Sequence, residues 1–330
     1  MASILDSVTA TLTPAVVGQI SKAIGVDTSL VQSGLNAVGP TVLGSLAKTA
    51  GTAEGATSLF KTLTGMTGGA TNSIGGLIDS ITGGGTDADM MQNLLGSGSN
   101  AITGTLAKSL GFDIGPLMKL GTPLLAGALG KSIKDMKLDA TGLASLLTKE
   151  AKAFMDNPAN KATSDLVASA LKAGDTAAAL RKTFSQADWN KVRMAPMAAT
   201  YVVMSASPSG FRGTGQELAA AAGAIVAAAK GASPTSLVGT AFGGGLTKAE
   251  LDALNSKAPT KAEALLAIKA GLTAVKAQSP TDAAAYRTMI LGVATKTAEA
   301  AKEGGFLGIG GTQVSPEEKV AISDITAALA

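Results

Sequence analysis

Three serine–lysine pairs are the groups in this sequence best suited to nucleophilic chemistry: Ser45–Lys48, Ser58–Lys61 and Ser169–Lys172. A lysine that is desolvated enough to be neutral can accept the proton of a serine hydroxyl and so activate it as a nucleophile. The same three-residue spacing also places both side chains on one exposed helix face. The companion motifs of known Ser-x-x-Lys enzymes are absent, so we interpret the pairs as surface residues.

The sequence contains no histidine and no cysteine. Their absence excludes an imidazole base, a thiolate nucleophile, a zinc cluster and a disulfide. Carboxylate pairs and oxygen-ligated Mg²⁺ or Ca²⁺ remain open, but Asp87-Ala-Asp89 lacks the glycine and the distal glutamate of an EF-hand loop. We therefore assign no catalytic, cofactor-binding or metal-binding residue, and we expect a protein that is not an enzyme and has no cofactor.

Charge and hydropathy give expectations about partners and location. The formal net charge is +3, and the basic residues are scattered rather than gathered in a stripe with aromatic residues, so we expect no nucleic-acid partner. No apolar run approaches the length of a membrane span, and Met1–Asp6 lacks the basic start of a signal peptide. We expect a cytoplasmic protein that could still touch a membrane surface.

The composition predicts an all-α fold. Hydrophobic residues make up 46% of the chain but aromatic residues only 3%, a bias that favours closely packed helices over sheets. Glycines and prolines divide the first fifty residues into three predicted short helices, 15–24, 29–38 and 41–48. In this interpretation Gly39 ends the second helix and Pro40 begins the third.

Two segments of this region recur later in the chain. Ile20–Asp27 matches Leu106–Asp113, and Pro40–Lys48 matches Pro123–Lys131, with glycine, proline and lysine at corresponding positions. Such matches inside otherwise varied apolar helices indicate an internal duplication.

The duplication sets the expected domain organisation. Residues 1–150 form one helical domain with copies at about 10–62 and 87–150, joined by a glycine-rich connector at 65–86. After Asn157-Pro158 the helices become longer and richer in alanine. We therefore expect a second domain, a helical bundle, over residues 158–330.

The first domain resembles the YidB-like family, bacterial proteins with a small helical domain of unknown function. The likeness covers about residues 10–150 and is carried by Met90–Gly96, Pro123–Gly130 and Asp139–Leu147, with Val17–Lys48 similar in the first copy. The resemblance implies an all-helical bacterial domain, and it brings no catalytic residues to transfer.

The second domain resembles the TerB-like helical family associated with tellurite resistance, over about residues 184–330. Val202–Ile225 and Val293–Ile325 share a layout of apolar helix, glycine-rich loop and helix beginning near a glutamate. The loops lack the Asp-Gly motif of that family, so no metal site is carried over.

Those glycine-rich loops, 207–215 and 304–311, supply the candidate interaction residues Phe211, Phe306, Leu307 and Ile309. The second loop has no Gly-Lys-Ser/Thr ending and is not a phosphate loop. Either the apolar side chains fold back over the adjoining helices, or they contact a partner or lipid.

Several side chains in the second half have predicted structural roles. Two apolar stripes should face the core, one made of Leu265, Ile268, Leu272 and Val275 and the other of Tyr286, Ile290, Val293 and Thr297. Trp189, with Arg193 one turn later, is expected to anchor a core or a domain junction rather than to form a cation–π ligand site. The small residues Gly223 and Ala227, four apart, predict either tight packing within one bundle or a flat face between subunits.

Three functional hypotheses follow. The leading one is a non-catalytic scaffold or self-assembling protein, present as a homo-oligomer or larger assembly. The alternative is a stress-linked peripheral membrane or lipid-binding protein. A Ser–Lys or carboxylate hydrolase is the remote alternative.

Overall fold

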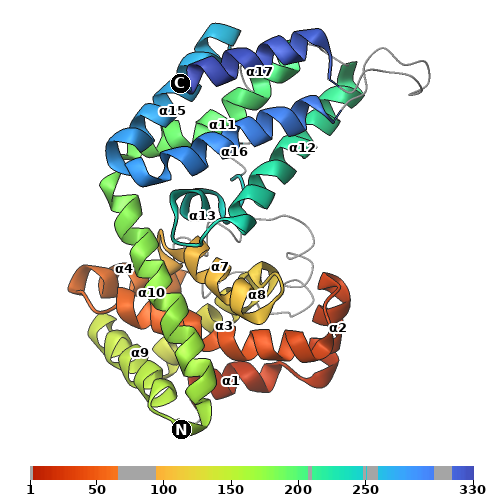
Figure 1. Cartoon of the computed structure of the whole chain (residues 1–330). Coiled ribbons are helices and arrows are strands. Elements are labelled where there is room, and N and C mark those ends of the chain that lie inside the picture. Colours follow the sequence, from red (N-terminus) through yellow and green to blue (C-terminus); the bar gives the residue numbers. More distant parts are fainter. Residues whose placement is uncertain (1–2, 66–93, 207–209, 248–249, 251–258, 301–313) are drawn as a thin grey trace. The chain divides into compact units, whose positions relative to one another are not determined.

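The computed structural model describes residues 3–65, 94–206, 210–247, 250, 259–300 and 314–330 (Figure 1). Within these residues every regular element is a helix, which confirms the predicted all-α class. The chain divides into two compact units, Met1–Asp175 and Thr176–Ala330, so the division falls within one helix, α10 (Lys161–Thr183), rather than at Asn157-Pro158. Leu171 of α10 packs on the core of the first unit, whereas Leu180 packs on the core of the second.

Two long helices, α3 and α8, form the centre of the first unit and pack against each other. Helices α1, α4 and α9 pack around them, and the core is built almost wholly of aliphatic side chains. The helices of this unit before α10 are α1 (Ile4–Thr11), α2 (Pro14–Ile24), α3 (Thr28–Thr49), α4 (Ala53–Gly65), α7 (Ser99–Leu110), α8 (Gly115–Asp135), α9 (Ala140–Met155) and the 3-10 turn η2 (Pro158–Asn160).

The prediction of two short helices at 29–38 and 41–48 is wrong, because α3 continues through Gly39 and Pro40. A proline inside a helix removes one backbone hydrogen bond and costs about 3 kcal/mol. Here Pro40 is buried and its neighbours Val38 and Val42 are at most 1% exposed. Burial of the whole central stretch outweighs the local preference for a break.

The two segments that the sequence predicts to be duplicated occupy similar structural settings. Gly25 ends α2 and Gly111 ends α7, both in the left-handed conformation, with φ of 67° and 78°. Each is followed by a long helix with an internal proline, Pro40 in α3 and Pro123 in α8. The predicted end of the first helix at Gly25 is confirmed.

The crossing of α3 and α8 brings equivalent positions into contact. A Cβ atom added to Gly34 of α3 would lie 2.5 Å from Leu117 Cδ1 of α8, and one added to Gly121 of α8 would lie 2.4 Å from Val38 Cγ1 of α3. In the register of the two prolines, position 34 corresponds to 117 and position 38 to 121. Each of the two predicted copies therefore contributes one glycine and one large side chain to the crossing.

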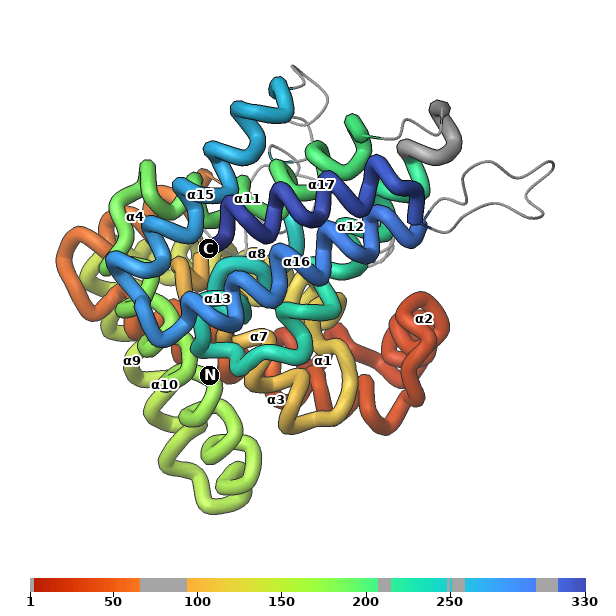
Figure 2. Tube along the Cα trace, turned by 45° about the horizontal axis from the view of Figure 1, so that its top comes forward, coloured from red at the N-terminus to blue at the C-terminus, as the bar shows by residue number. Residues whose placement is uncertain are grey.

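The second unit is a bundle in which α11 packs along α15 and α16, and α12 lies along α16 (Figure 1, Figure 2). The buried Tyr286 hydroxyl of α16 donates a hydrogen bond of 2.7 Å to the Val192 carbonyl of α11, and burial raises the pKa of this phenol. Pro196 does not interrupt α11. The helices of this unit after α10 are α11 (Gln186–Ala206), α12 (Gly210–Gly231), α13 (Leu237–Phe242), α15 (Lys261–Gln278), the 3-10 turn η3 (Pro280–Asp282), α16 (Ala283–Ala298) and α17 (Pro316–Ala328).

Both predicted apolar stripes face the core of the second unit. On α15, Ile268, Leu272 and Val275 are at most 4% exposed, and Leu265 is partly buried against the same core. The four stripe residues of α16 are likewise buried: Tyr286, Ile290, Val293 and Thr297.

Candidate functional site

The predicted interaction residues fall at the margin of the described structure. Phe306, Leu307 and Ile309 lie outside the described residues, as do Asp87 and Asp89. The prediction that Phe211 lies in a loop is wrong, because α12 already begins at Gly210. The glycines that suggested a loop there are outweighed by the alanine-rich run that follows them in the same helix.

The serine–lysine pairs lie on helices of the first unit. Ser45 is buried, while Lys48 is exposed and forms an ion pair with Asp175. Ser169 and Lys172 are both exposed on α10. A lysine with its amine in water stays protonated at neutral pH and is a poor base for an adjacent hydroxyl.

The remaining pair lines a shallow hollow on α4. Ser58 and Lys61 are exposed there beside Glu54 and Thr57, and the hollow has a volume of about 530 Å³. Its described lining comes from one helix face and is mostly polar. It does not provide the desolvation that a neutral lysine requires.

Arg193 lies over Phe242 rather than over Trp189, with its guanidinium carbon 5.4 Å from the ring centre. The ring of Trp189 instead lies beneath Arg181, whose guanidinium carbon is 4.7 Å from the ring centre. The rings of Trp189 and Phe184 pack edge to face. Trp189 is only 8% exposed, which agrees with its predicted role as a core anchor. The sequence interpretation missed the partners of Arg193.

Arg193 and its hydrogen-bond partners hold the end of α13 and the segment that follows it against α11. The Arg193 guanidinium forms a bidentate ion pair with Glu250 and also donates to the Ala241 and Gly245 carbonyls, the latter at 3.1 Å. Thr247 donates its backbone N–H and its hydroxyl to Glu250 at 2.8 and 2.9 Å. The guanidinium, the carboxylate and the Thr247 donors of this cluster form hydrogen bonds within the cluster. We therefore interpret the cluster as a structural clamp rather than a ligand site.

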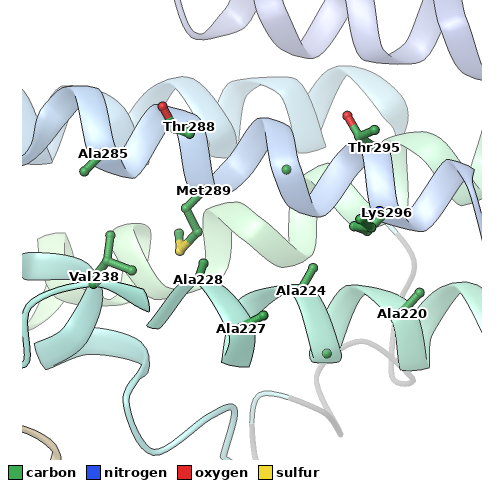
Figure 3. A pocket seen from close by; sticks show the side chains of 13 residues that line it. Ala220, Ala224, Ala227, Ala228, Val238, Ala285, Thr288, Met289, Thr295 and Lys296 are labelled. Carbon is green, nitrogen blue, oxygen red and sulfur yellow. The ribbon is translucent and has the colours of Figure 1, made fainter. Parts of the chain in front are cut away.

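A concave, apolar groove lies between α12 and α16 and is closed at one end by α13 (Figure 3). Its volume is about 840 Å³. The two helices run antiparallel along it, and Met289 points from α16 toward Ala228 on α12 (Figure 3). The lining residues are Ala220, Gly223, Ala224, Ala227, Ala228, Ala232, Val238, Ala285, Thr288, Met289, Gly292, Thr295 and Lys296. We call this surface the α12–α16 groove.

Small residues create the groove. Val238 and Met289, at 3% and 4% exposure, form its floor, whereas Gly223, Ala227 and Gly292 are exposed along its walls. A Cβ atom added to Gly223 or to Gly292 would meet no atom within 4 Å. The Gly223–Ala227 spacing therefore opens onto the groove instead of holding two helices of one bundle together.

The described residues that line the groove include a single charged side chain. Lys296 stands near the end of α16 and forms an exposed ion pair of 2.7 Å with Glu299. Thr288 and Thr295 are the other polar side chains of the lining. The groove is thus an almost wholly apolar surface with one cation at one end.

Two further findings concern the described part of the chain as a whole. It contains no group of three or more acidic residues arranged to hold a metal ion. Among its helices, none combines the length and the hydropathy that crossing a membrane would require.

Comparison with known proteins found no match among curated proteins and none among solved structures. These comparisons do not support the resemblance of residues 184–330 to the TerB-like family. The α12–α16 groove lies entirely in this part of the chain. Residues 6–132, under half of the chain, match the model of a family described as a bacterial protein of unknown function (DUF937), which includes YidB and supports the resemblance seen in the first unit.

Proposed function

We propose that this protein is a non-catalytic, self-associating protein that uses the α12–α16 groove to bind a helix. The observation that carries the proposal is the groove itself, an apolar hollow of about 840 Å³ walled by alanine and glycine. Among the described residues of its lining there is no carboxylate, and Lys296 carries the one amine that could move a proton. A site of this composition can bind an apolar surface but supplies little for chemistry.

The dimensions of the groove suit a helix. Its α16 wall runs from Ala285 to Lys296, which corresponds to about 16 Å at 1.5 Å per residue, or roughly three helical turns. Alanine and glycine walls allow a third helix to approach closely, as small residues do wherever helices pack tightly. An amphipathic helix would bury its apolar stripe in the groove and keep its polar face in water.

Filling the groove tests this function. The double variant Gly223→Leu/Gly292→Leu should fold normally, because a Cβ atom at either glycine would meet no atom of the described residues within 4 Å. We expect it to weaken self-association by at least about tenfold, since the leucines occupy the volume that a partner helix would enter. Sedimentation velocity or light scattering across a wide range of protein concentrations measures the effect.

A matched control is available on α8. Gly127 is exposed in mid-helix with no atom within 4 Å of an added Cβ, and Gly127→Leu should associate like the wild type. A wild-type chain that stays monomeric at every concentration would contradict the proposed function. So would a groove-filled variant that associates as strongly as the wild type.

Lipid binding is a second candidate function, favoured by the position of Lys296 at one end of the groove. A fatty acid could lay its chain along the alanine and glycine walls and place its carboxylate at this amine, and the volume is in the range of small-molecule sites. We expect any such binding to be lost in Gly223→Leu/Gly292→Leu and weakened in Lys296→Met. Titration with a fluorescent fatty acid, with co-flotation on neutral and anionic vesicles in parallel, measures it, and no binding in either assay removes this candidate.

A further inference from the structure

A concave groove requires a convex partner. Two copies of the α12–α16 groove placed face to face would leave an unfilled space between them, which forfeits the contacts that make apolar burial favourable. A symmetric contact of groove with groove is therefore poorly complementary. Self-association through this surface needs a protruding element from elsewhere on a second copy, which makes the contact heterologous.

The second unit carries such an element on α15. Leu266 is 66% exposed, more than any other large hydrophobic side chain in the described residues. It stands on the face of α15 opposite to the buried stripe, between Ala262 and Ala270 one turn away on either side. This face, with one large apolar side chain between two small ones, is referred to as the Leu266 ridge.

The ridge and the groove are complementary in shape. A single leucine between alanines is a knob, and the exposed Gly223, Ala227 and Gly292 surround an open hole of the kind that receives such knobs in packed helices. In its own chain Leu266 remains exposed to water, so its own groove does not accept it.

The charges near the two surfaces are also complementary. If Leu266 lies above Gly292 on a helix antiparallel to α16, Glu263 stands three residues to one side and Lys296 four residues along α16 to the same side. At 1.5 Å per residue these positions are about 4.5 and 6 Å from the knob, so the carboxylate and the amine meet at nearly one level. Both side chains are exposed, Glu263 bonded to Thr260 in a helix cap and Lys296 paired with Glu299. Neither contact shields them from a new partner.

We propose that the Leu266 ridge of one copy binds in the α12–α16 groove of a second copy, so that chains join head to tail. This inference rests on the proposed self-association and names its partner surface. Each added copy presents a free groove at one end and a free ridge at the other, so the assembly grows as an open filament or closes as a ring.

Two complementary variants test the inference. Leu266→Lys removes the knob and keeps the groove, whereas Gly223→Leu/Gly292→Leu fills the groove and keeps the knob. Each variant alone should be monomeric, and circular dichroism should show that both remain folded. Their equimolar mixture should form a heterodimer of twice the 32.3-kDa chain mass and no larger species. Val320→Lys, a change of the other strongly exposed aliphatic residue on α17, is the matched control and should assemble like the wild type.

Each outcome has a distinct meaning. A heterodimer from two monomeric variants supports head-to-tail binding. A Leu266→Lys variant that assembles like the wild type overturns the inference, and the proposed function survives if the groove-filled variant is still monomeric. Two monomeric variants whose mixture also stays monomeric overturn the head-to-tail arrangement. A monomeric wild type overturns both the inference and the proposed function on which it rests.

Discussion

Replacing Arg193 with methionine is expected to lower the free energy of unfolding of the second unit by about 3 to 5 kcal/mol. Methionine keeps the apolar stem that packs near Phe242 but removes the guanidinium. The Glu250 carboxylate, whose side chain is 14% exposed, then loses its cation, and the Ala241 and Gly245 carbonyls lose a donor. A buried charge left without its partner is among the most destabilising changes in a protein.

The fluorescence of Trp189 measures this loss of stability, and a second substitution on α11 serves as the control. Trp189 is the only tryptophan of the chain and lies in the core of the second unit, so its fluorescence during denaturant unfolding reports on that unit. Lys191→Met on the same helix removes a cation from an exposed pair with Asp188 and should cost less than about 1 kcal/mol. Equal effects of the two substitutions would show that the Arg193 cluster is not the clamp described above.

The same cluster gives the second unit a defined acid sensitivity. Burial alone would raise the pKa of the Glu250 carboxyl, but the hydrogen bond and charge of Arg193, together with the Thr247 donors, lower it below its ordinary value. A lowered pKa means that the stabilisation is complete above the unfolded value, about 4.3, and is lost as the pH falls through the lower folded value. In Arg193→Met only the Thr247 donors oppose the effect of burial on the Glu250 carboxyl, so this loss of stability on acidification should be absent, which unfolding curves between neutral and acidic pH would reveal.

Gly98→Ala is expected to destabilise the first unit by about 2 to 3 kcal/mol. Gly98 precedes α7 where that helix meets α10, and an added Cβ would lie 2.2 Å from the carbonyl oxygen of Gly174. Because the opposing atom belongs to the backbone, no side-chain rotation relieves the overlap, and the two helices must move apart. Faster amide hydrogen exchange in α7 and α10 would report the effect.

The opposite change is expected for a glycine in open space. Gly127→Ala on the exposed side of α8 meets no atom within 4 Å and should stabilise the same unit by about 0.5 to 1 kcal/mol, because alanine is the better helix former. The unfolding of the second unit, followed by Trp189 fluorescence, should be unchanged in both variants. Similar losses from Gly98→Ala and Gly127→Ala would contradict the close crossing at Gly98.

Helix boundaries set by adjacent residues were predictable from the sequence. The start of α17 at Ser315-Pro316 follows from a local arrangement, in which the Ser315 hydroxyl accepts from the Glu318 N–H and the Glu318 carboxylate accepts from the Ser315 N–H. The break at Gly39-Pro40 was wrongly predicted because the burial that carries α3 through the proline comes from other helices. Local rules describe a helix end well only where no tertiary contact opposes them.

The groove could not be found from local patterns. The sequence shows the small residues Gly223 and Ala227 at helical spacing, but whether they pack inward or open outward depends on where α16 lies. Met289 and Gly292 are more than sixty residues away in the chain. The partners of Arg193 could not be predicted for the same reason, because Phe242 and Glu250 are far from it in the sequence and become its neighbours only after folding. The glycine-rich segment 207–215 instead predicted an interaction residue in a loop, Phe211, which the structure places in α12.

The crossing of α3 and α8 distinguishes the two predicted copies of the duplication from each other. If the first copy met another of its own kind in this geometry, Gly34 would face Gly34 across a void and Val38 would collide with Val38. The second copy paired with itself would bring Leu117 against Leu117 and leave a gap at Gly121. Each copy is therefore complementary to the other and not to itself, so a chimaera that carries the same copy twice should lose the fit that the natural pair retains.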